Sequence, residues 1–376
     1  MPEDAAPLRH TALHDWHVAR GARMVGFAGW EMPLNYGSQL AEHAAVRHAA
    51  GLFDVSHMRP LEVRGPEART LLRYALANDV AKLDAEPGKA LYSTLLRADG
   101  GIMDDLIVYH RGGGAYRLVL NAAGAEADTA HLQALADAHD WRVTLRKRPD
   151  LGILAVQGPR ARAIAAMVLD LPALSGLAVF YALEQGGLFV GRTGYTGEDG
   201  VEVVCANALL PDLADRLVAA GVRPAGLAAR DSLRLEAGLD LYGQDMTAAD
   251  SPDASNLAWT VDLREPRDFL GRAALLARRA AGGEGSLVGL ALREGIPRHG
   301  CVVEDAGGRP CGVVTSGIFS PCLQCGIALA RLDAAMAPGT VCGVVVRGVR
   351  RPAQVVKPPF WRRGAATFSF PEEQEA

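Results

Sequence analysis

Two adjacent acids, Asp104 and Asp105, open a run of apolar, β-branched residues directly after the Gly100-Gly101 turn. A strand needs no acids at its start, and adjacent like charges repel each other, so at least one carboxylate is expected to have a function. Successive side chains on a strand point to opposite faces. The two acids are therefore not predicted to share one proton: one faces a cavity, and the other faces solvent or caps a turn. We predict that one of them is presented to a cofactor.

Glu202 is another acid in an apolar setting, because it lies between Val201 and Val203 in a predicted strand. One interpretation is an edge-strand residue that faces water, the commoner situation for a single Glu. The other is a carboxylate that receives paired N–H donors from a heterocycle such as a 2-amino-4-oxo pterin, through charge-assisted hydrogen bonds. Tyr92 and Tyr195 are candidates for stacking or for a lid, although each alone is also typical of core or surface.

Arg230 and Arg234 lie one turn apart on an otherwise small and apolar helix, with Asp231 and Glu236 nearby. Ion pairs within the helix are one explanation, and each would contribute only a few tenths of a kcal/mol. The alternative is an arginine that points into a pocket, toward an anionic tail or a ring carbonyl of a ligand.

Signatures of several common enzyme classes are missing. The sequence has no P-loop, no dinucleotide fingerprint after a strand, no nucleophile elbow and no zinc-protease helix motif, which disfavours ATP hydrolysis, nicotinamide chemistry and serine hydrolysis. Cys322 and Cys325 form the one close cysteine pair, and a zinc ribbon needs a second pair. We interpret both as ordinary thiols and predict no metal site.

Composition indicates a globular protein of more than one domain. The chain has 376 residues, 49% of them apolar and 22% charged, which is too long for one ordinary core. Its formal net charge of −4 provides no broad basic field for nucleic acid. The polar, acidic start does not resemble a signal peptide, and no apolar stretch has membrane-spanning length. We expect a soluble, cytoplasmic protein.

The elements that position these residues follow from periodicity and turn signals. Residues 38–50 are predicted to form a helix capped by Ser38, after an irregular segment at 32–36. From 52 to 145 the predicted order is β-α-β-β-α-β, the ferredoxin-like split pattern, which indicates an α+β architecture with antiparallel sheets.

The pattern changes after the small-residue run at 280–285, which is the best linker candidate. Short β runs separated by glycine turns follow, and they predict a small barrel or sandwich of about 90 residues. We predict that residues 1–284 hold two interleaved α+β domains, the second near 52–145 with parts to 223. Residues 285–376 are predicted to form a separate C-terminal domain.

Taken together, these motifs resemble those of the aminomethyltransferases, or T proteins, of the glycine cleavage system. The resemblance runs nearly end to end, and its motifs are specific as a set although each alone is weak. They include the segments at 23–34, 51–58, 89–93, 100–108, 157–159, 192–200, 224–231, 234–238, 242–246, 315–317 and 359–360.

The resemblance implies a three-domain cloverleaf with a C-terminal β-barrel around a central tetrahydrofolate channel. It also implies a reaction in which H protein brings an aminomethyl group on its dihydrolipoyl arm. Transfer to the co-substrate tetrahydrofolate gives 5,10-methylenetetrahydrofolate, ammonia and the reduced arm. The steps pass through cationic, iminium-like states, and a fixed anion in a partly dry pocket stabilises such charge.

Matched residue by residue, the resemblance assigns roles to six side chains. The family's catalytic aspartate falls on Asp105, and its pterin-recognising carboxylate falls on Glu202. The folate-contacting arginine falls on Arg230. The remaining three positions line the site: Tyr92, Asn121 and Tyr195.

Two related functions compete with this interpretation. Tetrahydrofolate-dependent demethylases use the same scaffold on methylated substrates, and they would keep the pterin residues. Non-catalytic folate-binding proteins of iron–sulfur maintenance carry a Cys in the segment that here spans 239–245, where this chain has none. The chain also departs from the family pattern at several positions, among them Gly124, which replaces a more polar residue after Asn121.

Overall fold

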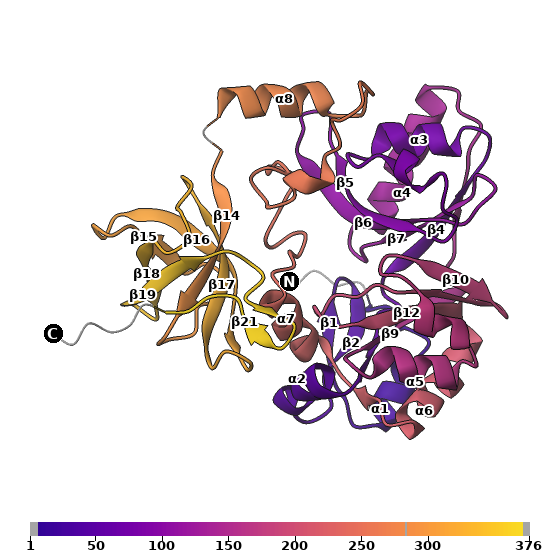
Figure 1. Cartoon of the computed structure of the whole chain (residues 1–376), viewed down its shortest axis with the longest axis horizontal. Helices are drawn as coiled ribbons and strands as arrows, with labels where there is room; N and C mark the ends of the chain where they lie inside the picture. The colour runs from indigo at the N-terminus through magenta and orange to yellow at the C-terminus, as the bar shows by residue number, and fades with distance from the viewer. Residues whose placement is uncertain (1–6, 283, 371–376) are drawn as a thin grey trace.

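The computed structural model describes residues 7–282 and 284–370, and it has three lobes (Figure 1). One lobe is a five-stranded sheet with helices, the second is a six-stranded sheet with helices, and the third is a closed β-barrel. The predicted α+β cloverleaf with a small C-terminal barrel is confirmed. Within the described ranges, no helix has the length and apolar character needed to cross a membrane.

The five-stranded sheet has the order β5-β6-β7-β4-β8, and every neighbouring pair is antiparallel. Its buried leucines and valines pack against residues of α3 and α4, which cover one face. The elements of this lobe are β4 (Arg59–Arg64), α3 (Ala68–Ala75), η1 (Val80–Leu83), β5 (Ala90–Leu96), β6 (Ile102–His110), β7 (Tyr116–Leu120), α4 (Ala125–Ala138) and β8 (Thr144–Lys147).

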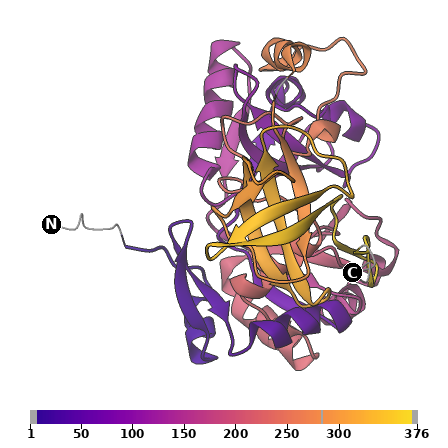
Figure 2. The same cartoon turned by 90° about the vertical axis from the view of Figure 1, so that its left-hand side faces the viewer.

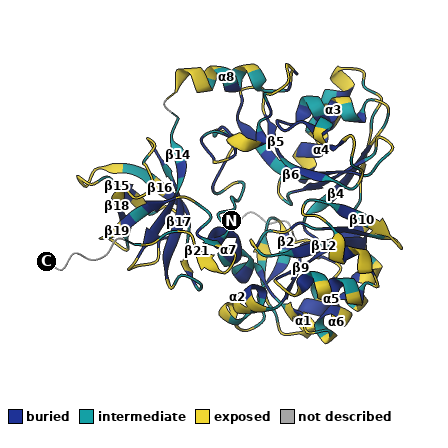
Figure 3. Ribbon diagram, viewed as in Figure 1, coloured by how far each residue is buried: buried dark blue, intermediate teal, exposed yellow. Residues whose placement is uncertain are grey.

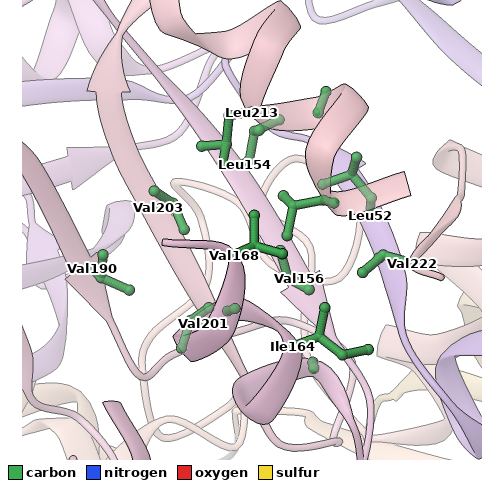
Figure 4. Packing of buried hydrophobic residues seen from close by; sticks show 14 of the residues in the cluster. Leu52, Leu154, Val156, Ile164, Val168, Val190, Val201, Val203, Leu213 and Val222 are labelled. Atoms are coloured by element: carbon green, nitrogen blue, oxygen red, sulfur yellow. The ribbon is translucent and has the colours of Figure 1, made fainter. Parts of the chain in front are cut away.

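The six-stranded sheet has the order β10-β11-β12-β9-β3-β13, in which only the β3–β13 pair is parallel. Figure 4 shows the apolar cluster that joins one face of this sheet to its helices. The elements are β3 (Gly51–Asp54), β9 (Leu151–Gln157), α5 (Ala161–Val168), η2 (Pro172–Gly176), β10 (Ala182–Gln185), β11 (Leu188–Gly191), β12 (Gly200–Ala206), η3 (Asn207–Leu209), α6 (Leu210–Ala219) and β13 (Arg223–Pro224).

The predicted order of residues 52–145 is wrong in two respects. The strand β3 does not belong with the elements that follow it, because it pairs with β9 in the other sheet. The lobe itself contains five strands, since β5, β6 and β7 form a three-stranded meander. Local periodicity identifies such strands, but a pairing between segments about one hundred residues apart leaves no signal in either segment.

The N-terminal part contains α1 (His14–Ala19), the hairpin of β1 (Arg23–Phe27) and β2 (Trp30–Asn35), and α2 (Gln39–His48). As predicted, the Ser38 hydroxyl caps α2 by accepting the backbone N–H of Ala41 at 3.3 Å. The irregular segment predicted at 32–36 is wrong, because β2 covers most of it. Proline is tolerated there since β2 has only one neighbouring strand. Figure 2 shows this hairpin at the side of the molecule.

The barrel closes in the order β14-β17-β16-β15-β18-β19. Its strands are β14 (Ser286–Leu292), β15 (Val302–Glu304), β16 (Pro310–Ser320), β17 (Cys325–Leu332), β18 (Val341–Val346) and β19 (Val349–Val356). The helix α8 (Arg272–Ala281) precedes it, so the first residues of the predicted linker are helical. Shorter elements are η4 (Ala258–Thr260), β20 (Trp361–Arg362) and β21 (Ala365–Ala366). The proposed boundary at 284/285 stays a prediction.

Helix α7 (Leu227–Glu236) connects the barrel with the rest of the molecule (Figure 1). Arg234 is buried, and its guanidinium donates to Asp245 at 2.6 Å and to Ser316 of β16 at 2.8 Å. Glu236 accepts hydrogen bonds from Ser320 of the barrel at 2.5 Å and from Arg47 of α2 at 2.8 Å. These buried ionic contacts fix α7 between the two parts.

The two sheets face each other with the sides that are turned away from α3 and α4 and from α5 and α6, and residues of α2 and α7 also pack in the cluster between them. Tyr109 and Val119 of the five-stranded sheet share an apolar cluster with Phe53, Ile153 and residues further along the other sheet. Figure 3 shows buried residues along the strands and exposed residues on the outer sides of the helices. Side chains that alternate away from the helices therefore point into the space between the sheets.

Candidate functional site

Asp104 and Asp105 lie near the start of β6, directly after a β-bulge. Leu96 pairs with Ile102 and Leu95 with Asp104, so Met103 is the extra residue. Beyond the bulge, burial alternates as expected for a strand. Asp104 points to the helix-covered face and is fully buried, whereas Asp105 points to the helix-free face and stays partly exposed. The alternation predicted from the sequence is confirmed.

The carboxyl group of Asp105 is held by two neutral donors. The Tyr92 hydroxyl donates to Oδ2 at 2.9 Å, and the Asn121 amide donates to Oδ1 at 3.0 Å. Burial and the charge of Asp104 raise the pKa of Asp105 to about 7, although both hydrogen bonds oppose that rise. Near neutral pH this carboxyl group is therefore able to accept a proton and to release one.

The expectation that the acid on the opposite face, Asp104, faces solvent or caps a turn is wrong. Asp104 lies inside the lobe, where its Oδ1 accepts the Asn121 amide and the backbone N–H of Asp105, both at 2.8 Å. Its other neighbour is Asp128 of α4. A buried acid in a strand therefore needs partners from elsewhere in the chain, which its own sequence neighbours do not reveal.

Glu202 lies on β12 and points away from α5 and α6, since its neighbours Val201 and Val203 pack in the apolar cluster with these two helices. Thr193 donates its hydroxyl to Glu202 Oε2 at 2.6 Å and is itself bonded to the Tyr109 hydroxyl at 2.9 Å. Among the described residues no other group bonds Glu202, so Oε1 is available to a ligand. The solvent-facing edge-strand interpretation is wrong, because β12 lies inside its sheet.

Arg230 projects from α7 over the ring of Tyr195, with 4.6 Å between its guanidinium carbon and the ring centroid. Burial lowers the pKa of Arg230, and no carboxylate of the described chain forms an ion pair with it. Arg234 does form the expected pair within the helix, with Asp231 at 2.9 Å. A partly buried guanidinium without an ionic partner is unfavourable, so Arg230 is suited to a ligand that supplies negative charge or carbonyl oxygen.

Tyr195 links the group around Arg230 with the group around Asp105. Its hydroxyl donates to the backbone carbonyl of Asp240, and it lies within electrostatic range of both Arg230 and Asp105. Arg230 in turn lies within range of Glu202. All six side chains assigned by resemblance are partly exposed, and Tyr195 and Arg230 are the two of them that line the cavity described next.

Tyr195 and Arg230 line a cavity of about 530 Å³, together with Phe27 of β1 and Phe319 of β16. A larger hollow of about 710 Å³ lies over Ala90, Leu91 and the exposed Trp259, and none of the six side chains lines it. Trp259 nevertheless stacks on Tyr92, with 5.6 Å between ring centroids. The first cavity therefore provides space for a ligand next to Arg230 and Tyr195.

Comparison with known proteins identifies the family. The GCVT N-terminal domain family matches residues 13–265, and the glycine cleavage T-protein C-terminal barrel domain family matches residues 286–361. The chain belongs to the glycine cleavage T-protein family.

Individual family members are similar over nearly their whole length. The aminomethyltransferase of Stenotrophomonas maltophilia strain K279a is 51% identical over 365 residues, which covers 95% of this chain and 97% of that protein. The aminomethyltransferase of Methylococcus capsulatus strain Bath is 50% identical over 96% of this chain and 99% of its own. The crystal structure of aminomethyltransferase T from Bartonella henselae superposes with a TM-score of 0.89 at 38% identity, over 95% of this chain and 99% of that one.

Other groups of this T-protein family member were not identified from the sequence. Thr193 and Tyr109 support Glu202, and Asp128 lies behind the acids of β6. His57 lies within range of Arg230, and burial together with that charge lowers its pKa to about 4. A hydroxyl or histidine in an apolar strand is too common to be noticed in one sequence, and only the fold brings these groups to the site.

Two clusters of potential metal ligands occur in the described part of the chain, and neither contains one of the six side chains. His10, His14 and Glu31 form one at the N-terminal surface. The other consists of His43, Glu236 and Cys322, where the Glu236 carboxylate already pairs with Arg47. The prediction that the site itself uses no metal stays a prediction.

Proposed function

We propose that this protein is the aminomethyltransferase of glycine cleavage, with tetrahydrofolate as co-substrate and lipoylated H protein as partner. The aminomethyl carbon passes from the dihydrolipoyl sulfur to two nitrogens of tetrahydrofolate. Ammonia and the free dihydrolipoyl thiol are the other products. The two hydrogens that leave the folate nitrogens balance those gained by ammonia and by sulfur.

One observation carries the proposal: Arg230 lies within electrostatic range of Glu202, Tyr195 lies within range of both Arg230 and Asp105, and no described residue forms an ion pair with Asp105, Glu202 or Arg230. Each group keeps a free binding capacity that costs stability. Perturbed and unpaired charged groups concentrate at sites where a ligand supplies the missing partner. Tetrahydrofolate offers N–H donors, a ring carbonyl and an anionic tail, which match these three groups.

Glu202 and Arg230 serve binding in this proposal. Glu202 accepts the amino and ring N–H groups of the pterin with its free oxygen and the one that Thr193 orients. Arg230 is held flat on Tyr195, which leaves its N–H groups directed at a carbonyl or carboxylate of the ligand. Because both groups are already fixed, little conformational entropy is lost when the ligand binds.

Asp105 serves the chemical step. Its carboxyl group titrates near neutrality, so it takes up a proton released by an attacking nitrogen and returns one to the departing amine. As an anion it also stabilises the positive charge that develops at the transferred carbon. Tyr92 and Asn121 hold its two oxygens in place and so fix its orientation. The aminomethyl group is already activated on its carrier, so no nucleophile on the protein is required.

The test is to mix the purified protein with tetrahydrofolate and aminomethyl-loaded H protein, and to follow ammonia and 5,10-methylenetetrahydrofolate together. We expect both products in equal amounts, at a rate far above the enzyme-free mixture. A rate equal to the enzyme-free one would refute the proposal. If a methylated amine or thioether replaces the loaded H protein and methylated folate forms instead, the protein is a demethylase.

A further inference from the structure

A third acid lies behind the pair on β6. Asp128 of α4 is 1% exposed, and Asp104 is fully buried beside it. Apart from the other acid of this pair, no group of the described chain bonds Oδ2 of Asp104 or Oδ2 of Asp128, and the two side chains lie close to each other. Two ionised carboxylates in such a position would repel each other strongly. One proton must therefore lie between them.

Gly124 makes this close approach possible. A Cβ atom at position 124 would lie 1.9 Å from Asp104 Oδ2 and 3.1 Å from Asp128 Oδ2. The two oxygens thus gather over the bare Cα atom at the beginning of α4. Any larger residue would occupy the space in which they meet, so the contact depends on glycine at this position.

The other oxygens show which acid carries the proton. Asp104 Oδ1 accepts two N–H groups, from Asn121 and from the backbone of Asp105. Such bonds stabilise an ionised carboxylate. Asp128 receives none from the described residues, and burial together with the charge of Asp104 raises its pKa to about 9. Asp128 is therefore the protonated acid, and Asp104 is the anion that accepts its hydrogen.

We propose that Asp128 is a positioning residue for Asp105. Its protonated carboxyl group donates a hydrogen bond to Asp104, and this bond keeps a fixed negative charge and an oriented Asn121 amide beside the reacting carboxyl group. The Asn121 amide touches Asp104 Oδ1 and Asp105 Oδ1 at once, so the orientation of the buried anion determines that of the amide. The role of Asp105 in the reaction rests on the function proposed above, but the arrangement of the acids does not.

Other charged and titratable groups surround these acids, but the Asp104 anion has the largest electrostatic effect on Asp105. Asp105 faces Tyr92 from β5 and Tyr195 from the loop before β12, both neutral because burial raises their pKa values, and Asp240 from the segment after α7. Tyr242 lies within electrostatic range of Asp104 and Asp128, and the exposed Arg97 lies within range of Tyr242. Among the charged groups, Asp104 raises the pKa of Asp105 most.

The test compares Asp128→Leu with Asp128→Asn in the full chain. An amide at 128 still donates to Asp104, whereas a leucine does not, so Asp104 then takes up the proton itself. We expect the pKa of Asp105 to fall by about one unit in the leucine variant and to stay within about 0.3 units in the asparagine variant. The pKa is read from carboxyl 13C chemical shifts of labelled aspartate, with Asp105→Asn for assignment.

This titration uses the free protein, so it remains informative if the proposed function fails. In the turnover assay, the acidic limb of the pH profile should move by the same amount. Equal pKa values of Asp105 in both variants would overturn the proposal. If the leucine variant does not fold, Asp104→Asn provides the second test, because it removes the charge and should lower the pKa of Asp105 by a similar amount. Asp137→Asn, exposed on the same helix, is the matched control and should change neither value.

Discussion

Replacing Asp105 with Asn should make the protein more stable and nearly inactive, and the gain in stability should depend on pH. Burial and Asp104 raise the pKa of Asp105 to about 7, whereas an aspartate in an unfolded chain titrates near pH ~4. Between these values the folded protein binds more protons than the unfolded chain, so its stability falls as pH rises through this window. A neutral amide of the same shape removes that loss.

The size of the effect follows from the shift. A rise of about three pKa units corresponds to about 4 kcal/mol, which is fully present at pH 8, where Asp105 is ionised in both states. At pH 5 the folded carboxyl is still protonated, and only about 1.5 kcal/mol remains. An unfolding entropy of about 2 cal/mol/K per residue converts 4 kcal/mol into about 5 °C for a chain of 376 residues.

The measurement is thermal unfolding of the wild type and the Asp105→Asn variant at both pH values, with Asp137→Asn as the exposed control. We expect the variant to unfold about 5 °C higher at pH 8 and about 2 °C higher at pH 5. Turnover should fall by about 10²- to 10⁴-fold while folate affinity changes little. Equal unfolding temperatures at pH 8 would show that the carboxyl carries no such strain, and unchanged turnover would move the catalytic role elsewhere.

Three further substitutions separate binding, proton affinity and packing. Glu202→Gln should weaken tetrahydrofolate binding by about 10- to 100-fold in a fluorescence titration, since it replaces charge-assisted hydrogen bonds by neutral ones; unaltered binding would contradict the pterin assignment. Tyr92→Phe removes a donor to the Asp105 carboxylate, so the acidic limb of the pH–turnover profile should move to higher pH, and a move to lower pH would count against this contact. Gly124→Ala should lower the free energy of unfolding by about 2 to 4 kcal/mol, because its Cβ meets Asp104 Oδ2 at 1.9 Å, and a neutral outcome would mean that the acids have room to separate.

Alternation in the sequence predicted that one of the two acids faces a site but not which one, and the family resemblance selected Asp105. The period of two along β6 places Asp104 and Asp105 on opposite faces, and this holds in the fold. The burial of Asp104 depends on Gly124 and Asp128, which reach it only because α4 covers the sheet. A contact made by tertiary packing has no counterpart in local periodicity.

The same limit applies to the binding residues. An arginine on an apolar helix suggested two possibilities, and only the fold shows that Arg234 is paired whereas Arg230 has no ionic partner among the described residues. The family resemblance had selected Arg230, because it carries information from folded relatives. The assignment of β3 failed for the corresponding reason, since its partner β9 begins about one hundred residues later.

One turn of α7 has a consequence for how the enzyme can be dissected. Arg230 reaches the cavity from the same helix whose Arg234 and Glu236 are bonded into the barrel. Removing the barrel would take away the hydrogen bonds of Arg234 to Ser316 and of Glu236 to Ser320, and it would uncover Leu235, which packs among barrel side chains. A shortened chain that keeps all six candidate site residues would thus lose the support of Arg230 and the barrel residue Phe319 of the cavity lining. Substitutions at Ser316 or Ser320 would then resemble binding defects in a screen, although neither is among the six site residues.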